Sequence, residues 1–473
     1  MALTSEQIKA ISEGITRELS GGASYSAGSY TGGTADCLFD DIRDAIRAAK
    51  EAQARLMDLS LEQRGQIIES IRQAARDNAV MFSELAHAET GYGKVHHKIA
   101  KNLLAANKTP GIEDLHPTAF SGDDGLTIVE TAPYGVIGSI TPSTNPTATV
   151  INNSISMIAA GNGIVFCPHP AAKRSSQTAM KVVNEAIIRA GGPACLIAGA
   201  KDPTLEASQI VMESPDIKLM AVTGGEAVVA VAMKSGKKCI AAGPGNPPVI
   251  VDETADIVDA AKKIVDGASF DNNVLCVAEK ECFCVNSVFD RLMSEMERNG
   301  AYRISGADID KVVNTALIKK DNGKYVINRK FVGHDATYIL KESGVPFTGD
   351  PVLVIAEVDR YHPFVEVEML MPVLGCVRVA NFDEALAESF RAEHGCQHSA
   401  LIHSTNIHNM SRAAKKMNTT IFVKNAPSYS GLGYGGEGYT TLTIATPTGE
   451  GLTSAKSFTR ARRCVMKDAL RYI

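Results

Sequence analysis

The chain has 473 residues, which is too long for one ordinary hydrophobic core, so we expect two or three domains. Hydrophobic residues make up 45% of the chain and charged residues 21%, which excludes a disordered protein and fits a globular enzyme. The net charge is −5 and lysine and arginine are scattered, so no nucleic-acid partner is expected. No apolar run reaches the length of a membrane span, so no membrane-spanning segment is expected. Ten cysteines without a regular framework, and no secretory signal, favour free thiols in a reducing interior. Four of them lie in apolar surroundings and are expected to be core residues: Cys167, Cys195, Cys239 and Cys376.

The first 35 residues are predicted to form a tethered helix. Apolar residues recur at near-helical spacing over residues 1–19, with charged residues between them. Residues 20–35 contain mainly Ser, Gly, Ala, Thr and Tyr, a composition typical of a flexible linker. A tethered amphipathic helix is a candidate docking tag, and the alternative is a helix packed onto the body of the protein.

Residues 36–247 are predicted to form helices and then a parallel sheet. Residues 36–120 are mainly helical in pattern, and residues 126–140 suggest strands broken at Pro133 and Gly135. Short apolar strands then alternate with helices, which is typical of a parallel sheet with crossover connections. The expected strands are 163–167, 195–198, 217–222 and 238–241, and the expected helices are 147–160, 174–190, 203–213 and 225–235.

The second half repeats this style, so we expect an α/β fold throughout. A strand at 249–252 and a helix at 254–267 precede a loop, and a strand at 281–285 follows it. Further strands are expected at 352–357, 374–379, 399–403 and 420–423. Residues 439–473 look extended and then basic, with a strand near 440–447 that could pair with residues near 126–137.

The segment FDNNVLCVAEK (270–280) contains the candidate nucleophile, Cys276. It follows the polar loop Asp271–Asn273, and loops beside rigid elements often hold nucleophiles. A thiolate attacks carbonyls well and leaves thioesters readily, so cysteine suits acyl transfer. An isolated cysteine is more often a core residue, and the assignment therefore depends on other segments.

Four other segments have the pattern of a nucleotide and oxyanion site. ITPSTNP (140–146) follows a strand and holds Asn145 between prolines, where its amide can donate to an oxyanion. AVTGG (221–225) ends a strand and opens a helix, a suitable context for phosphates. GPGNPP (243–248) is a constrained loop, and CPHP (167–170) lies at another strand end.

These segments, in this order, resemble the aldehyde dehydrogenase superfamily, from about residue 36 to the C-terminus. The resemblance makes Cys276 the catalytic cysteine and Asn145 the oxyanion-hole asparagine. It implies a Rossmann-like nucleotide-binding domain, an α/β catalytic domain and a small oligomerisation element. It further implies that the nicotinamide cofactor is bound by Thr141, Pro142, His169, Pro170, Thr223, Gly224, Gly225, Val228, Gly243 and Glu368.

The stretch IAAGPGNPP (240–248) is similar to the coenzyme A-acylating branch. Hydrolytic members carry a glutamate base before Gly-Gly-Lys, whereas here Ala241 or an immediate neighbour takes its place. Without a base, water attacks an acyl-enzyme slowly, and a thiol needs less help. The resemblance therefore implies oxidation of a short-chain aldehyde with NAD and coenzyme A to acyl-CoA through an acyl-Cys276 thioester, reversibly. Alternatives are a hydrolytic dehydrogenase, an acyl-phosphate reductase and a catalytically silent scaffold.

The N-terminal pattern resembles that of acylating enzymes packaged in bacterial microcompartments, in particular the propionaldehyde dehydrogenases of propanediol utilisation. This implies a location in the microcompartment lumen and docking of residues 1–19 on shell or core proteins. It also implies propionaldehyde, or alternatively acetaldehyde, as the substrate.

The resemblance divides the chain into three parts after residue 35. Residues 36–125 and 138–245 would bind the nucleotide, and residues 246–435 would form the catalytic domain. Residues 126–137 and 436–473 would form the oligomerisation element and tail of a dimer or tetramer, because exposed strand edges favour pairing with another subunit.

Three further motifs are given no catalytic role. GLGYGGEG (431–438) contains a GxGxxG match but is followed by extended residues rather than a helix, so a mobile loop is expected. HGCQH (394–398) lacks a second cluster and no metal is expected; His398 lines the active-site funnel or simply packs. His96 and His97 are expected at the surface.

Overall fold

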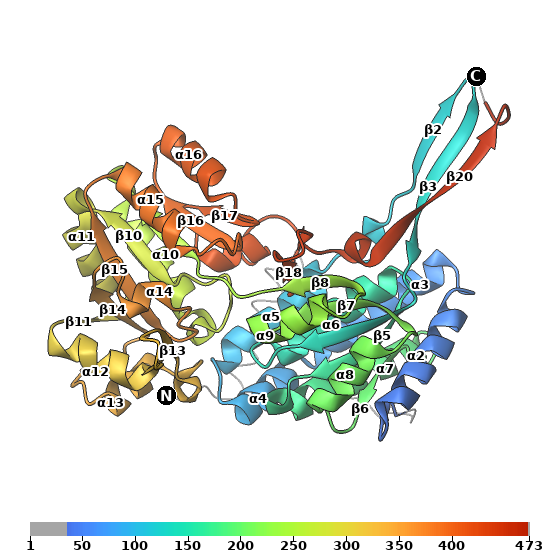
Figure 1. Ribbon diagram of the computed structural model, residues 1–473, viewed down its shortest axis with the longest axis horizontal. Coiled ribbons are helices and arrows are strands. Elements are labelled where there is room, and N and C mark those ends of the chain that lie inside the picture. The colour runs from blue at the N-terminus through green and yellow to red at the C-terminus, as the bar shows by residue number, and fades with distance from the viewer. Residues whose placement is uncertain (1–35, 472–473) are drawn as a thin grey trace. The chain divides into compact units, whose positions relative to one another are not determined.

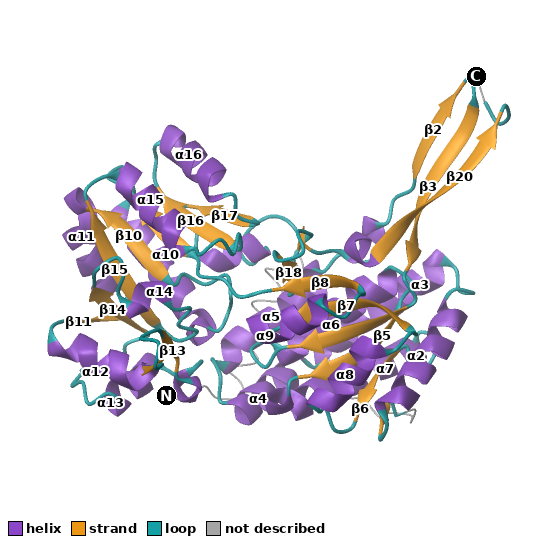
Figure 2. Cartoon of the chain, viewed as in Figure 1, coloured by secondary structure: helices purple, strands orange, loops and turns teal. Residues whose placement is uncertain are grey.

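The computed structural model describes residues 36–471, which divide into two compact units (Figure 1). The first unit comprises residues 36–90, 99–242 and 439–471, and the second comprises residues 91–98 and 243–438. Each unit alternates strands with helices (Figure 2). The amphipathic helix expected over residues 1–19 and the linker over residues 20–35 lie outside the described residues.

The first unit is built on a six-stranded parallel sheet. Its strands are β1 (Leu38–Phe39), β4 (Val136–Thr141), β5 (Gly163–Pro168), β6 (Ile197–Ala200), β7 (Ile217–Thr223) and β8 (Lys238–Ala242). They lie in the order β1-β6-β5-β4-β7-β8, and every neighbouring pair is parallel. The strands expected at 163–167, 217–222 and 238–241 are confirmed, and the one expected near 195–198 begins two residues later.

Helices cover both faces of this sheet because its strands are apolar on both sides. In β5, Ile164 and Phe166 belong to one hydrophobic core, and Val165 and Cys167 belong to the other. Helices α3 (Leu61–Asp77), α6 (Pro146–Ala159) and α7 (Lys173–Arg189) contribute to the first core. Helices α2 (Ile42–Leu56), α8 (Leu205–Glu213) and α9 (Glu226–Met233) contribute to the second. Helix α4 (Ala79–Thr90) belongs to this unit, and α5 (Val95–Lys108) begins in the second unit and ends in the first.

The second unit is built on a seven-stranded parallel sheet of order β11-β14-β15-β10-β9-β16-β17. The strands are β9 (Pro248–Val251), β10 (Glu281–Val285), β11 (Ala301–Ile304), β14 (Leu353–Glu357), β15 (Val373–Val379), β16 (Ser399–His403) and β17 (Ile421–Lys424). All the strands expected from the sequence in this region are confirmed within one residue, and β11 is additional. A small antiparallel pair, β12 (Leu317–Lys319) and β13 (Tyr325–Ile327), lies outside the main sheet. The helices are α10 (Ile257–Ser269), α11 (Asn286–Arg298), α12 (Ala307–Ala316), α13 (Ala336–Glu342), α14 (Pro363–Glu366), α15 (Phe382–Ala392) and α16 (Ile407–Met417).

A three-stranded antiparallel sheet belongs to the first unit and joins segments that are far apart in the sequence. β3 (Gly125–Pro133) pairs with β2 (Thr118–Gly122) on one side and with β20 (Thr459–Lys467) on the other. The partner strand was expected near 440–447, and this expectation was wrong: that region holds only the short β18 (Ile444–Ala445), which pairs with β19 (Gly451–Leu452). β20 is exposed along most of its length, so its sequence carries no alternation of apolar and polar residues that could reveal it.

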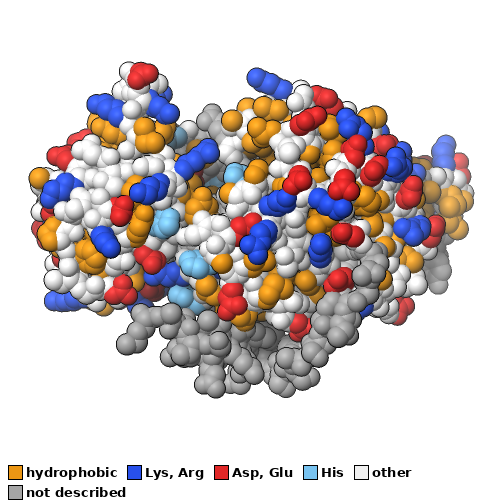
Figure 3. All heavy atoms as spheres, turned by 90° about the horizontal axis from the view of Figure 1, so that it is seen from below, with side chains coloured by type: hydrophobic (Ala, Val, Ile, Leu, Met, Phe, Trp, Pro, Cys, Tyr) orange, Lys and Arg blue, Asp and Glu red, His pale blue; other side chains and the backbone are white. Residues whose placement is uncertain are grey.

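Three remaining expectations concern single residues, nucleic acid and the membrane. Cys167, Cys239 and Cys376 are buried as expected, but Cys195 is partly exposed. Lysine and arginine side chains are interspersed with aspartate and glutamate among the described residues on the face shown in Figure 3. Within residues 36–471, the structure contains no helix with the length and apolar character needed to span a membrane.

Candidate active site

Cys276 follows a short loop whose backbone conformation is unusual. Asp271, Asn272 and Asn273 have φ angles of 49°, 53° and 64°, three consecutive left-handed residues in a buried segment. Asn and Asp tolerate this conformation better than other residues with a side chain, which explains the composition of the loop. The loop turns the chain sharply between the end of α10 and the start of β10, and it places Cys276 at the turn.

Asp271 is fixed by a buried ion pair and two backbone contacts. Its carboxylate accepts hydrogen bonds from the Lys98 Nζ at 3.2 Å and from the Lys94 backbone N–H at 2.8 Å. Its own N–H donates to Nδ1 of His97 at 2.9 Å. The side chains of Lys98 and Asp271 are 4% and 0% exposed, so water cannot replace either partner.

The two asparagines are fixed through their amide groups. Nδ2 of Asn272 donates to the Gly333 carbonyl and to Oδ1 of Asp335, both at 2.8 Å. Nδ2 of Asn273 donates to the Ala268 carbonyl at 2.8 Å and to the Glu279 carbonyl at 2.9 Å. The backbone leading into Cys276 is therefore held at every residue of the turn.

A fully buried lysine lies beneath the same loop. Lys280 Nζ donates to the Asn273 carbonyl at 2.9 Å, to Oδ1 of Asn273 at 2.5 Å and to the Leu275 carbonyl at 3.2 Å. Burial lowers the pKa of Lys280, against the opposing effect of Glu368. The ammonium group thus anchors the loop and also brings a positive charge close to Cys276.

The surroundings of the half-buried Cys276 favour its thiol over its thiolate. Burial raises its pKa to about 12, the charge of Glu368 adds to this effect, and Lys280 opposes it. The nucleophilic form of cysteine is the thiolate. Activation of Cys276 therefore requires a change in its surroundings, such as the arrival of a positive charge.

The loop GPGNPP packs directly against the segment that contains Cys276. A Cβ atom on Gly245 would lie 3.0 Å from the Cys276 carbonyl oxygen and 2.8 Å from Cγ of His398, so no larger residue fits without movement. Nδ2 of Asn246 donates to the Val365 and Ala392 carbonyls at 2.8 and 2.9 Å and fixes the loop. This stretch contains no carboxylate beside the cysteine.

The carboxylate whose charge acts on Cys276 is Glu368. It accepts a hydrogen bond from the Gly245 backbone N–H, and its pKa is raised by burial, with Lys280 and that hydrogen bond opposing. Glu368 lies in the segment between α14 and β15, in the second unit together with Cys276 and Gly243. The raised pKa makes Glu368 a stronger proton acceptor than an ordinary glutamate, although Lys280 and the Gly245 N–H oppose this effect.

His398 is buried beside Gly245 and is neutral near pH 7. Burial lowers its pKa to about 4, with Lys280 adding to the effect. Its Nδ1 lies 2.9 Å from Oγ of Ser399, and its buried Nε2 has no hydrogen-bond partner among the described residues. The ring packs against the Gly245 loop and is fully buried, which fits a packing role for His398, and its lining of an active-site funnel stays a prediction.

The candidate cofactor residues of the first unit gather at one edge of its parallel sheet. β4 ends at Thr141, β5 ends at Pro168 just before His169 and Pro170, and β7 ends at Thr223. Carboxyl ends of neighbouring parallel strands form the usual binding crevice of such sheets. Gly224 and Gly225 lead into α9, where Val228 packs on the core. Pro142 follows Thr141, whose buried hydroxyl has no partner among the described residues, so the edge offers an unused polar group.

Asn145 lies at the start of α6, in the same unit as that edge. It precedes Pro146, the first residue of the helix, and its side chain is partly exposed. Its Oδ1 accepts a hydrogen bond from Nζ of Lys101 at 2.6 Å. The proline that follows Asn145 restrains the backbone at the start of the helix.

The structure changes the interpretation of several other residues. His96 and His97 were expected at the surface, but both are half-buried, and His97 stacks on Phe270 with ring centroids 4.3 Å apart. Lys98, Lys101 and Lys280 were missed, because a lysine in a sequence gives no sign of burial when its partner comes from a distant segment. The fully buried Glu279 was missed too; Ser428 binds it through its N–H at 2.8 Å and its Oγ at 2.6 Å.

The structure also describes the glycine-rich motif GLGYGGEG and the possible metal ligands of HGCQH. In GLGYGGEG, a Cβ atom on Gly431 would lie 2.4 Å from Ile421, so this glycine is required by packing. No helix starts within the motif, as expected. Among residues 36–471, no group of three or more His, Cys, Asp or Glu side chains is arranged to hold a metal ion.

Comparison with known proteins gives matches over most of the chain. The chain is 52% identical over 443 residues to an acetaldehyde dehydrogenase (acetylating) of Bilophila wadsworthia, covering 92% of this chain and 91% of that protein. It is 47% identical to the propanal dehydrogenase (CoA-propanoylating) of Salmonella typhimurium, covering 91% and 92%. A Rhodopseudomonas palustris propionaldehyde dehydrogenase, solved with bound CoA and an acylated cysteine, is 45% identical with a TM-score of 0.90, covering 93% and 100%.

A solved propionaldehyde dehydrogenase from the Clostridium phytofermentans fucose utilisation bacterial microcompartment is 47% identical, again with a TM-score of 0.90 and coverage of 93% and 100%. The family model described as "Aldehyde dehydrogenase family" matches residues 24–445. The resemblance and the fold expected from the sequence are therefore confirmed, and the chain belongs to the aldehyde dehydrogenase family.

Proposed function

We propose that this protein is a coenzyme A-acylating aldehyde dehydrogenase that oxidises a short-chain aldehyde with NAD⁺ and coenzyme A. The observation that carries the proposal is the Gly-Pro loop packed on Cys276. Gly245 approaches the nucleophile segment so closely that a larger side chain does not fit, and no residue of 240–248 is a carboxylate. The relatives named above, which are described as acetylating or CoA-propanoylating, support the same reaction.

The first half of the proposed reaction forms a thioester on Cys276. The Cys276 thiolate adds to the aldehyde carbonyl, and the resulting oxyanion accepts hydrogen bonds from the Cys276 N–H and, as the family resemblance assigns, from Nδ2 of Asn145. One such donor contributes about 3–4 kcal/mol to stabilising the transition state. NAD⁺, when bound, supplies the hydride acceptor. Thr141, His169 and the turn Thr223–Gly225 would hold its phosphates and adenosine part, and Glu368 its nicotinamide ribose.

The second half transfers the acyl group from Cys276 to the coenzyme A thiol. The loop over Cys276 offers water no free base, so hydrolysis of the acyl-enzyme is slow. A thiol near neutral pH is a good nucleophile without strong base assistance. Because one thioester replaces another, the free energy changes little and the reaction is reversible.

Omission of coenzyme A tests the proposal directly. Without it, NADH should form only as a burst of about one equivalent per active site, and with it turnover should continue. Cys276→Ala should abolish both, whereas Cys464→Ala, which removes an exposed free thiol on β20, should keep both. Continuous NADH formation without coenzyme A would show a hydrolytic enzyme, and restoration by inorganic phosphate would show an acyl-phosphate enzyme.

The proposal also includes a preferred substrate and a preferred cofactor. We favour propionaldehyde over acetaldehyde and NAD⁺ over NADP⁺; a neighbouring structure, an engineered glycolyl-CoA reductase with 44% identity, contains NADP⁺. A series of aldehydes assayed with each nucleotide, read as kcat/KM from NADH or NADPH absorbance, decides both. A preference for acetaldehyde or for NADP⁺ would reject the corresponding choice.

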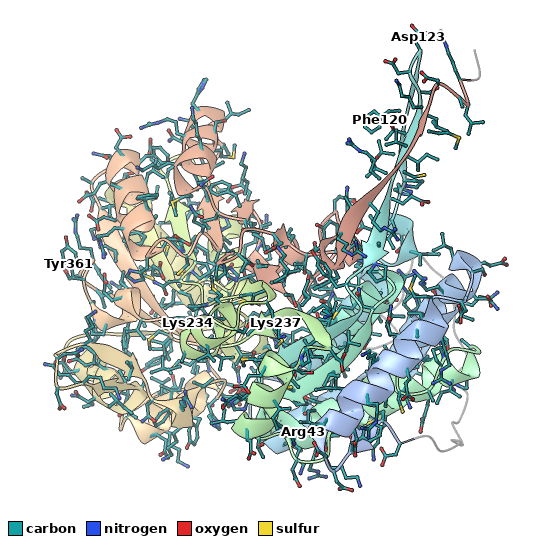
Figure 4. All side chains as sticks on the ribbon, turned by 45° about the vertical axis from the view of Figure 1, so that its right-hand side comes forward. Arg43, Phe120, Asp123, Lys234, Lys237 and Tyr361 are labelled. Atoms are coloured by element: carbon teal, nitrogen blue, oxygen red, sulfur yellow. The ribbon has the colours of Figure 1, made fainter. Side chains whose placement is uncertain are left out.

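We also propose that the enzyme works in a bacterial microcompartment as a homo-oligomer. The sequence of residues 1–19 has the amphipathic pattern of a docking tag for shell or core proteins. Deletion of residues 1–20 should leave turnover intact and abolish co-sedimentation with shells; unchanged co-sedimentation rejects the tag. The unpaired edges of β2 and β20, with Phe120 58% exposed near the tip (Figure 4), suit pairing with another subunit.

A further inference from the structure

Helix α5 presents a buried lysine to the start of α6. Lys101 is one of nine consecutive buried residues of α5, from Lys98 to Ala106. A buried ammonium group needs oxygen partners, because burial removes its water. The amide of Asn145 provides one of them: Nζ of Lys101 donates to Oδ1 of Asn145 at 2.6 Å, and the Thr144 carbonyl lies 3.5 Å away.

This contact determines whether the oxygen or the NH₂ group of the Asn145 amide faces Lys101. Lysine has three N–H donors and no acceptor, so only the amide oxygen can face it. The NH₂ group must then point away from Lys101, and it donates to Oγ1 of Thr144 at 3.3 Å, a long contact. Asn145, which is partly exposed, is therefore held with its donor group directed away from Lys101.

We propose that Lys101 is a positioning residue that keeps Asn145 in the donor orientation and polarises its amide. This inference rests on the proposed function, in which Nδ2 of Asn145 donates to the oxyanion. Without Lys101, rotation about the terminal side-chain bond exchanges oxygen and nitrogen, and the oxygen would repel an oxyanion. A hydrogen bond from a cation is also stronger than one between neutral groups, and it makes the amide a better donor at its other end.

Other contacts hold α5 against α6 without Lys101. Oγ1 of Thr147 donates to Oδ1 of Asn102 at 2.8 Å, and Nδ2 of Asn152 donates to Oγ1 of Thr109, the residue after α5, at 2.9 Å. The two helices therefore keep their register when Lys101 is replaced. Thr147→Val removes a contact between the same two helices that does not involve Asn145, which makes it a matched control.

A double-mutant cycle tests the inference. Asn145→Ala should lower kcat for acylation about 100- to 1,000-fold. Lys101→Met should lower kcat about 10- to 100-fold, with a much smaller change in the aldehyde KM, as expected for a charge-assisted bond acting in the transition state. In the Asn145→Ala background, Lys101→Met should have no further effect. Thr147→Val should keep kcat within about 3-fold of wild type.

The outcomes separate the inference from the proposed function. Wild-type kcat in Asn145→Ala would overturn the oxyanion role and the inference together. If Asn145→Ala has a low kcat, two results would overturn the inference and leave the oxyanion role standing. The first is that Lys101→Met lowers kcat by the same factor in the wild type and in Asn145→Ala. The second is that Lys101→Met lowers kcat no more than Thr147→Val does.

A second pair of variants tests the contact even if Lys101→Met does not fold. Asn145→Asp keeps an oxygen for Lys101 but removes the donor, so it should match Asn145→Ala in kcat while retaining the melting temperature of the wild type. Asn145→Ala should melt lower, because the buried ammonium loses an acceptor. Equal melting temperatures for Asn145→Ala and Asn145→Asp would overturn the inference.

Discussion

Replacement of Asp271 by asparagine should destabilise the second unit strongly. The substitution keeps the size of the side chain and its tolerance of the left-handed backbone, so the main change is the loss of charge. Lys98, which is 4% exposed, then lacks the carboxylate that lies 3.2 Å from its Nζ. Breaking a buried pair by removing one partner costs about 3–5 kcal/mol, because a buried charge is left uncompensated.

This cost can be converted into a melting temperature. For a domain of the size of the second unit, each kcal/mol corresponds to roughly 2–4 °C, so Asp271→Asn should lower the melting temperature of that unit by about 6–20 °C. The turn before Cys276 should loosen at the same time, and native alkylation of Cys276 by iodoacetamide at pH 8 should accelerate. Differential scanning calorimetry and the alkylation rate measure the two effects.

A matched control distinguishes burial from the mere loss of an ion pair. Asp259→Asn breaks the exposed pair between Lys263 and Asp259 within α10 of the same unit, which is worth at most about 1 kcal/mol. Lys98→Met combined with Asp271→Asn removes both charges and should be more stable than Asp271→Asn alone. Equal melting temperatures for Asp271→Asn and Asp259→Asn, or a double variant less stable than the single one, would refute the reasoning.

Three further predictions concern the site and its acid stability. Gly245→Ala should lower kcat at least about 10-fold, because its Cβ would meet the Cys276 carbonyl at 3.0 Å and shift Cys276, and the same overpacking should lower stability by about 1–3 kcal/mol; wild-type kcat in this variant would contradict the close packing. Glu368→Gln should raise the KM for NAD⁺ and leave the requirement for coenzyme A unchanged. It should also speed alkylation of Cys276, since the charge of Glu368 raises the pKa of Cys276. Loss of the coenzyme A requirement in this variant would contradict the assignment of Glu368 to the nicotinamide ribose. Burial lowers the pKa of His403 to about 4, with Lys263 adding to the effect. Between pH 6.5 and 4 the unfolded chain therefore binds a proton that the native chain does not, and the free energy of unfolding falls as the pH falls. Going from pH 7 to pH 5, the wild type should lose about 2 kcal/mol more stability in urea titrations than His403→Asn; equal losses would place the pKa near its ordinary value.

The sequence predicts the two parallel sheets well because their physics is local. Segments such as 217–222 and 281–285 are short, apolar and flanked by helical patterns, and buried parallel strands have this composition. β20 escaped prediction because it is exposed, so nothing in its own residues marks a strand. Its pairing with β3 depends on a segment more than 300 residues away.

The sequence nominates candidate reactive residues but not the side chains that hold them in place. Cys276 and Asn145 lie in segments with recognisable turn residues and proline positions. Lys98, Lys101 and Lys280 look like ordinary surface lysines in the sequence, and only the fold brings each to the oxygen atoms that justify its burial. The same is true of His97, whose ring accepts the Asp271 N–H across about 170 positions of the chain.

The interruption of the first unit by the second has a consequence for synthesis on the ribosome. β3 emerges early, but its partner β20 is made only after the whole second unit has been translated. One edge of β3 therefore remains unpaired while more than 300 further residues are synthesised, and exposed strand edges can pair with other chains. Neither unit can be expressed as a continuous fragment of the gene, and chimaeras that exchange units between relatives need four junctions, at 90/91, 98/99, 242/243 and 438/439.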